Sequence, residues 1–147
     1  MFELGSILLV KNYRLPTKIK DKFFIVTGVT EDEIILMSMT TSQIYFDFSL
    51  IKYGTIKDRD MSIYCFPKKQ IIGKNGFYFH QNTFISHRSN IFSISTTKMK
   101  SLNIEYMDCL TDQEIINLVY SFYSSESVSK KHKKVFEKIL FKITKKT

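Results

Sequence analysis

The stretch FIVTGVTEDEIILMSMTTSQ, residues 24–43, contains two apolar runs on either side of an acidic turn. Runs rich in Val, Ile and Phe and bounded by turn residues are typical of buried strands, so the stretch predicts a β-hairpin. The second run continues past its last apolar residue into Ser38, Thr40, Thr41, Ser42 and Gln43. Such residues are ordinary where a strand leaves the core for solvent. They also suit a polar site held at the end of a rigid sheet, and both interpretations stay open here.

Strand-like runs extend in both directions from this hairpin. Short β-branched and aromatic runs occur at residues 6–12, 22–29, 32–40, 61–66, 76–85 and 90–95, and a weaker one at 44–51. Pro16 and its charged neighbours mark a connection between the first two runs, and Asn75-Gly76 marks a turn before the run at 76–85. Short strands with little helix between them predict a mainly β fold, as a small barrel or a strongly curved sheet.

The sequence pattern changes from strand-like to helical near residue 110. Thr111 followed by Glu114 has the form of a capping box, which begins a helix. Behind it, apolar residues repeat at helical spacing, at Ile115, Leu118, Val119 and Phe122. After SSESVS, a second, amphipathic helix is predicted from about Ser129, with Val135, Phe136, Ile139, Leu140 and Ile143 on its apolar face. We therefore expect residues 1–109 to form the β part and residues 110–147 to pack on it as C-terminal α-helices, within a single domain.

Length and composition set the class of protein. The chain has 147 residues, 44% of them hydrophobic, which is enough for one full core. Cys65 and Cys109 are far apart and in no metal-binding or redox spacing, so we expect no metal and no cofactor. No apolar run approaches the roughly 20 residues that span a bilayer, and the first one lacks the basic lead-in of a signal peptide. A cytoplasmic protein is expected.

The net charge of +8 is concentrated at one end of the chain. Residues 127–147 contain eight lysines and a single acidic residue, Glu137, so this segment carries seven of the eight net charges. The usual explanation of a lysine face is solvation. The alternative is a surface that attracts RNA or an acidic protein segment. Phe141 falls among the lysines when residues are placed at 100° intervals, and an aromatic ring there favours the alternative.

The order of the segments carries a family resemblance. GSILLV, a loop, KDKFFIV, a turn and IILMSMTTSQ, followed later by GFYFHQNTFI and LTDQEIINLVYSF, resemble the PemK/MazF family of toxins from bacterial toxin–antitoxin systems over roughly residues 4–123. The resemblance implies an SH3-like β-barrel that forms a homodimer, cleaves single-stranded RNA without a metal and is neutralised by a cognate antitoxin. CcdB-type toxins use the same fold to bind DNA gyrase, so a non-catalytic barrel that acts by binding another protein is the alternative.

The resemblance also implies two catalytic residues. The catalytic threonine of the family follows the third hydrophobic strand and corresponds to Thr41, with Thr40 as the neighbouring choice. The catalytic arginine opens the second strand in a motif like RPVVI, and Lys22 stands at that place in this sequence, without the proline that follows the arginine. Lysine offers a phosphate a point charge, whereas arginine offers a planar fork.

A histidine completes the predicted catalytic set. Cleavage of RNA by its own 2′-hydroxyl requires removal of that proton, stabilisation of charge on the phosphate and protonation of the leaving oxygen. Imidazole side chains titrate near neutral pH and so suit the proton transfers. We select His80, inside the run at 76–85, although a lone histidine in a sheet is more often a packed or surface residue.

Further residues are candidates for contact with RNA. Tyrosine stacks on bases in single-strand binders, and arginine suits phosphate geometry. The predicted RNA-binding set is Tyr13, Arg14, Lys20, Thr40, Gln43, Gln81, His87 and Arg88. Asp58 and Asp60 stand two residues apart, a spacing that suits the metal ligands of a metal-dependent nuclease. Lys57 and Arg59 alternate with them, so neutralised surface charge is the better interpretation.

Overall fold

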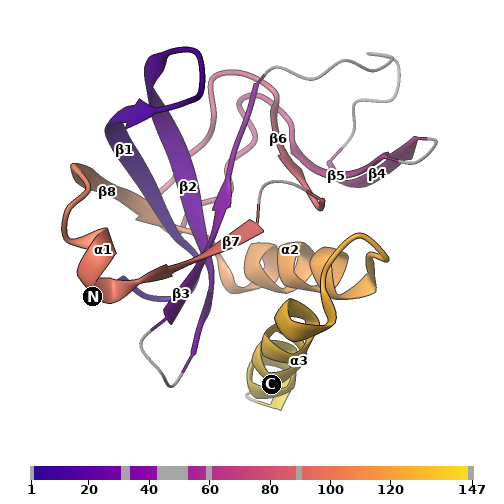
Figure 1. Cartoon of the computed structure of the whole chain (residues 1–147). Helices are drawn as coiled ribbons and strands as arrows, with labels where there is room; N and C mark the ends of the chain where they lie inside the picture. The colour runs from indigo at the N-terminus through magenta and orange to yellow at the C-terminus, as the bar shows by residue number, and fades with distance from the viewer. Residues whose placement is uncertain (1, 31–33, 43–52, 59–60, 89–90, 146–147) are drawn as a thin grey trace.

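The protein folds into two antiparallel sheets followed by two C-terminal helices (Figure 1). The computed structural model describes residues 2–30, 34–42, 53–58, 61–88 and 91–145. The weak strand predicted at 44–51, and the candidate residues Gln43, Arg59 and Asp60, lie outside these ranges.

The larger sheet has the strand order β7-β3-β2-β1-β8. Its strands are β1 (Ser6–Arg14), β2 (Ile19–Val29), β3 (Ile34–Met39), β7 (Ile91–Ser95) and β8 (Ile104–Cys109). Four of them confirm the runs predicted at 6–12, 22–29, 32–40 and 90–95. The sequence did not predict β8. This edge strand exposes three consecutive side chains, those of Glu105, Tyr106 and Met107, and therefore lacks the alternation that marks a half-buried strand.

The ladders of the larger sheet contain three register shifts, one of which lies between Ile7 and Leu8 where β1 pairs with β8. The register of β1 against β2 shifts between Val10 and Tyr13, and Asn12 within the shift has a φ of 56°. The backbone N–H of Asn12 donates to Asp21 Oδ1 at 2.9 Å and so fixes this bulge. A third shift, between Val26 and Gly28, lies where β2 pairs with β3. Such irregularities increase the local twist of the strands.

The smaller sheet has the strand order β4-β5-β6, with β4 (Gly54–Asp58), β5 (Met61–Phe66) and β6 (Thr83–Ser86). It joins the larger sheet where Thr41, just after β3, pairs with Phe84 of β6. The two residues exchange backbone hydrogen bonds of 2.9 and 2.8 Å. Within the described ranges the strands do not close into a barrel. The prediction of a mainly β fold is confirmed, and β5 confirms the run at 61–66.

The strand predicted over residues 76–85 is mostly wrong. Only its end is a strand, in β6, and residues 76–82 form a loop that starts at Gly76, whose φ is +90°. The alternating aromatic residues Phe77 and Phe79 pack against the ring of Phe23, with centroid distances of 5.8 and 5.3 Å. Their spacing looks like that of a strand because every second side chain points into the core, but loop packing produces it.

The C-terminal helices are α2 (Asp112–Ser124) and α3 (Lys130–Lys145), and a short α1 (Thr96–Met99) follows β7. Thr111 caps α2 as predicted, because its hydroxyl accepts the N–H of Glu114 at 3.3 Å. The predicted apolar face of α2 is buried, and its Phe122 ring packs on Phe136 of α3 with a centroid distance of 5.4 Å. No helix in these ranges is long and apolar enough to cross a membrane.

Apolar clusters cover both faces of the larger sheet. On one face Ile7, Ile25 and Leu36 pack with α2, α3 and the aromatic residues of the smaller sheet. The alternate residues Leu8, Phe24 and Met37 point to the other face, where Met99 of α1 joins them. The C-terminal helices therefore pack on the sheets through the first cluster.

Polar side chains also join the smaller sheet to α2. The hydroxyl of Tyr53 donates to Glu114 Oε2 at 2.6 Å and accepts from Asn117 Nδ2 at 2.7 Å. The hydroxyl of Thr55 donates to that of Ser121 at 2.7 Å. Hydrogen bonds are directional, so these contacts fix the helix in one position on the sheet, which apolar contacts alone do less strictly.

His87 lies at the centre of this joint. Its Nδ1 is 2.8 Å from the Ser62 hydroxyl of β5, and its Nε2 is 3.0 Å from the Ser121 hydroxyl of α2. The ring is 2% exposed and meets Phe122 edge to face. Burial lowers the pKa of His87 to about 4, because the low-dielectric interior disfavours the charged ring. The neutral imidazole therefore bridges the two hydroxyls at physiological pH.

Replacing His87 should change how stability depends on pH. The pKa of His87 is about 4 when folded and near 6.5 when unfolded, so between these values the unfolded chain binds more protons. The parent should lose about 3 kcal/mol of unfolding free energy from this group as the pH falls from 7 to 4. His87→Gln should lack that part of the loss, as measured by urea unfolding across this range. The exposed His80→Gln is the control, and an equal pH dependence in parent and His87→Gln would contradict the prediction.

Candidate functional site

A cavity of about 370 Å³ opens beside the N-terminal end of β2. The last pair between β2 and β3 is Phe24 with Met39, so residues 19–23 of β2 continue beyond the end of β3. The loop before β6 forms the opposite wall. The β2–β3 pocket, as we call it, is lined by Lys20, Asp21, Lys22, Phe23, Thr40, Thr41, Ser42, Phe79, His80, Gln81 and Thr83.

The hydroxyl residues that end β3 serve both the fold and the pocket. Ser38 is buried and lies 3.2 Å from the hydroxyl of Thr27. The hydroxyl and the backbone N–H of Thr40 both donate to the carbonyl of Phe23 at 3.0 Å. Thr41 joins the two sheets through its backbone, and its position lines the pocket. Ser38 and Thr40 are thus buried and hydrogen-bonded within the fold rather than leaving it for solvent, and the interpretation as a polar site stays a prediction.

Lys22 brings positive charge into a sheltered position. Its residue is only 9% exposed, and no carboxylate in the described ranges lies close enough to form an ion pair with it. Burial and repulsion from Lys20 and Lys18 lower the pKa of Lys22 from its ordinary value. A bound anion would relieve both effects, so the electrostatics of the pocket favour a negatively charged ligand.

A buried carboxylate positions the opposite wall. Asp108 of β8 is 1% exposed and accepts the backbone N–H groups of Asn75 at 3.0 Å, Phe77 at 3.1 Å and Cys109 at 2.7 Å. Burial by itself would raise the pKa of Asp108, but these donors outweigh it, so the pKa is lowered. Gly73 is required beside the carboxylate, because a Cβ at that position would lie 2.1 Å from Asp108 Oδ2.

The loop held in this way presents His80 and Gln81 to the pocket. Phe79 is buried against Phe23 of β2, which fixes the residue before His80. The hydroxyl of Thr83 donates to the carbonyl of Gln81 at 2.9 Å and fixes the residue after it. His80 itself is exposed and lines the pocket.

The pocket gathers most of the residues predicted from the sequence. All three predicted catalytic residues line it, and so do three of the predicted RNA-binding set: Lys22, Thr41, His80, Lys20, Thr40 and Gln81. These residues come from three separate segments of the chain. Their combination of ammonium groups, hydroxyls, an amide and an imidazole can donate to phosphate oxygens and move a proton.

The other predicted RNA-binding residues lie elsewhere. Tyr13 pairs with Lys20 across the β1–β2 ladder, but its ring packs edge-on against Phe24 at 5.0 Å. Arg14 is exposed at the end of β1. Neither lines the pocket, so their contact with RNA stays a prediction, as does that of Gln43, which lies outside the described residues.

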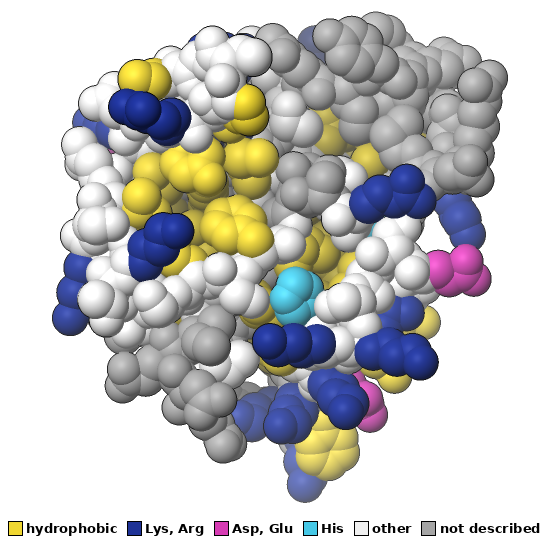
Figure 2. All heavy atoms as spheres, in the orientation of Figure 1, with side chains coloured by type: hydrophobic (Ala, Val, Ile, Leu, Met, Phe, Trp, Pro, Cys, Tyr) yellow, Lys and Arg dark blue, Asp and Glu magenta, His cyan; other side chains and the backbone are white. Residues whose placement is uncertain are grey.

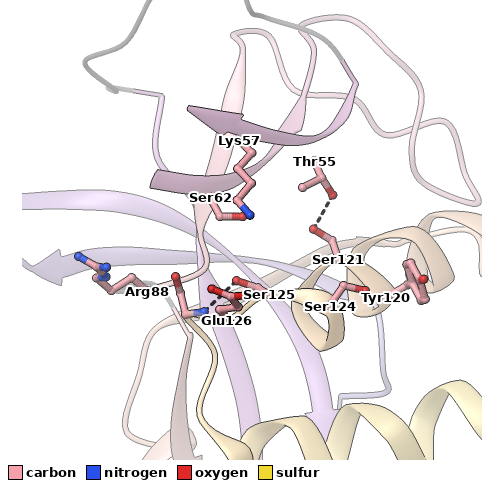
Figure 3. Close-up of a pocket in the computed structure, with 10 residues that line it drawn as sticks. Thr55, Lys57, Ser62, Arg88, Tyr120, Ser121, Ser124, Ser125 and Glu126 are labelled. Carbon is pink, nitrogen blue, oxygen red and sulfur yellow. Dashed lines mark hydrogen bonds between the residues drawn. The ribbon is translucent and has the colours of Figure 1, made fainter. Parts of the chain in front are cut away.

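Arg88 lines a second, larger cavity, of about 650 Å³, between the smaller sheet and α2 (Figure 3). It is lined by Thr55, Lys57, Ser62, Arg88, Tyr120, Ser121, Ser124, Ser125, Glu126 and Ser127. His87 is buried with both ring nitrogens held by serines, so the geometry supports a structural role for it. The guanidinium of Arg88 extends away from the side chains of α2 in Figure 3. Neither His87 nor Arg88 lines the β2–β3 pocket, and their contact with RNA stays a prediction.

Sequence reasoning missed several members of the pocket and its support. Phe23 and Phe79 were interpreted only as strand residues, and Thr83 was not singled out. The sequence offered one signal for Asp108, which is an acidic residue between Met107 and the apolar residues Cys109 and Leu110. A carboxylate buried in such a segment needs specific hydrogen-bond donors. In the described part of the chain, no group of three or more His, Cys, Asp or Glu side chains is placed to hold a metal ion.

Comparison with known protein families, curated proteins and solved structures yields no match.

Removing the Asp108 carboxylate should destabilise the protein and disturb the pocket. Asp108→Ala leaves the N–H groups of Asn75, Phe77 and Cys109 without their acceptor, at a cost of about 3 kcal/mol of unfolding free energy in a urea titration. NMR signals of His80 should also shift, because the loop before it is released.

The matched control is Asp112→Ala. Asp112 is an exposed aspartate whose ion pair with Lys74 spans 3.7 Å, so its loss should cost at most about 1 kcal/mol. Equal effects of the two substitutions would show that the Asp108 carboxylate does not organise the loop.

Proposed function

We propose that the protein is a toxin endoribonuclease of the PemK/MazF type, which cleaves single-stranded RNA in the β2–β3 pocket without a metal. The observation that supports the proposal best is the convergence of Lys22, Thr41 and His80 on one pocket. The family resemblance selected the first two from widely separated segments, and the requirement for proton transfer selected the third.

Each residue has a chemical role in this proposal. The 2′-oxygen of the RNA attacks the adjacent phosphorus and the bond to the 5′-oxygen breaks, which leaves a 2′,3′-cyclic phosphate. The Lys22 ammonium stabilises the negative charge that develops on the phosphate oxygens, and Thr41 donates a hydrogen bond to one of them. His80 takes the proton of the 2′-hydroxyl and returns a proton to the leaving oxygen. Phe23 and Phe79 give the pocket an apolar wall for a base.

The remaining features of the family belong to the same proposal. The two sheets would be the parts of an SH3-like barrel, joined at the pairing of Thr41 with Phe84. The active form would be a homodimer that a cognate antitoxin neutralises. The edge strand β8 offers a surface for one of these partners, since Tyr106 and Met107 are exposed there and the Phe2 ring stacks on Tyr106 at 6.5 Å.

Cleavage assays test the catalytic assignment. Purified protein with single-stranded RNA and EDTA should yield discrete fragments that end in cyclic phosphate. Thr41→Ala and Lys22→Met should each reduce the rate on the order of a hundredfold or more, because each removes a donor to the transition state. Lys22→Arg should retain activity, since it restores the charge with the fork of the family's arginine. Methionine keeps the apolar stem of Lys22, so melting temperatures should change little.

The controls separate this function from its rivals. Lys68→Met replaces an exposed lysine outside the pocket and should leave cleavage unchanged. Cleavage that requires magnesium would move the chemistry to acidic residues such as Asp58 and Asp60. Intact RNA under all conditions, with growth arrest on expression retained by Lys22→Met, would favour the non-catalytic alternative, a CcdB-like barrel that binds a protein.

A further inference from the structure

The outer side of α3 carries a regular row of lysines. Lys130, Lys134, Lys138 and Lys142 are all exposed and follow one another at four-residue intervals, and we call them the lysine stripe. Four residues advance roughly 6 Å along an α-helix, so the stripe presents evenly spaced charges along most of α3. In Figure 2, Lys and Arg side chains gather at the end of the molecule where Figure 1 places this helix.

The stripe is electrostatically unfavourable within the protein itself. Like charges four residues apart on a helix repel one another. The first turn of α3 contains no acidic residue, although the helix dipole favours negative charge there. The ion pairs found among the described residues join Lys11 with Glu105 and Lys74 with Asp112, and neither involves α3. Lysines spread around the exposed surface of α3 would solvate the helix equally well without repelling one another. The alignment of these lysines in one row therefore favours the binding of an external polyanion.

The opposite side of α3 is anchored, so the stripe keeps a fixed orientation. Phe136 is fully buried, and Ile139 and Ile143 pack against the main apolar cluster. Val135 packs beside Gly28 of β2, where an added Cβ would lie 3.1 Å away. Gly28 is six residues along β2 from Lys22, which corresponds to roughly 20 Å. The stripe and the β2–β3 pocket are thus separate surfaces at a defined spacing.

An exposed aromatic ring lies among these charges. Phe141 is 63% exposed, which is unusual for a large apolar side chain on a helix that has a buried face available. The Nζ of Lys145 lies 4.8 Å from its ring centroid, so the ring is bordered by positive charge. Aromatic rings beside a basic track are typical of proteins that bind single-stranded nucleic acid.

We propose that α3 is a docking surface for single-stranded RNA, in which the lysine stripe binds successive phosphates and Phe141 stacks on an unpaired base. The inference rests on the proposed function for its choice of RNA over an acidic protein segment, since an RNA substrate would have to reach the β2–β3 pocket as well. An RNA long enough to contact both surfaces gains affinity from α3, whereas a short one that fills only the pocket does not.

The test compares full-length variants by fluorescence anisotropy with a labelled, unstructured RNA of about 20 nucleotides. The triple variant Lys134→Gln, Lys138→Gln, Lys142→Gln should bind on the order of tenfold more weakly at low salt, and the slope of log affinity against log salt should flatten by about 2. Phe141→Ala should weaken binding with the slope unchanged. The melting temperature of the triple variant should not fall, because the substitutions remove repulsion.

Two controls make the result specific. A triple variant at other exposed lysines, Lys68→Gln, Lys98→Gln and Lys100→Gln, has the same net charge and should keep the parent's affinity more closely. Cleavage of a dinucleotide should be equal in the parent and the stripe variant, whereas KM for the long RNA should rise with kcat unchanged.

The docking surface and the cleavage site can fail separately. If the Lys22→Met variant does not cut RNA but still binds the long RNA through the lysine stripe, the docking proposal is supported independently of the cleavage proposal. Equal affinity and equal salt slope in the parent and the stripe variant would overturn the proposal and return the lysines to solvation. Displacement of the RNA by polyglutamate at the same charge concentration would overturn the assignment to RNA in favour of an acidic protein partner.

Discussion

The buried carboxylate of Asp108 is the constraint on which the arrangement of the pocket depends. It receives backbone N–H groups from both β8 and the loop that begins after Gly73, two segments more than thirty residues apart. A buried acceptor with several donors fixes its surroundings more strictly than apolar contact does, because leaving any donor unpaired is costly. From this anchor the loop carries Phe79 onto Phe23 of β2, and the next residues face the end of β3.

A second polar anchor fixes the helices to the smaller sheet. His87 and its two serine partners, with the neighbouring bonds of Tyr53 and Thr55, connect β4, β5 and α2. The apolar cluster supplies the main driving force for packing the helices, and these directional bonds select one position among those it permits. Both anchors are buried ionisable groups whose pKa values are lowered, so both couple the fold to pH.

Positive charge is used differently on the two basic surfaces of the molecule. In the β2–β3 pocket, Lys22 is sheltered, and the charges of Lys20 and Lys18 repel its own. On α3 the charges are exposed and evenly spaced. A sheltered charge acts strongly on one bound group, because the local dielectric constant is low, whereas an exposed row acts weakly on many groups and is sensitive to salt. The first arrangement suits chemistry on one phosphate, and the second suits holding a strand.

The sequence by itself determined the elements whose signals are local. Apolar runs predicted most of the larger sheet, and the Thr111 capping box and apolar periodicity predicted α2 and α3. It also placed Lys22, Thr41 and His80 in one candidate site. Only the tertiary structure showed that residues 76–82 are a loop, that β8 is an edge strand, and that Asp108 organises the pocket wall. The physical reason is that these features depend on hydrogen bonds and aromatic contacts between distant segments, which leave either no periodic pattern along the chain or, at Phe77 and Phe79, one that resembles a strand.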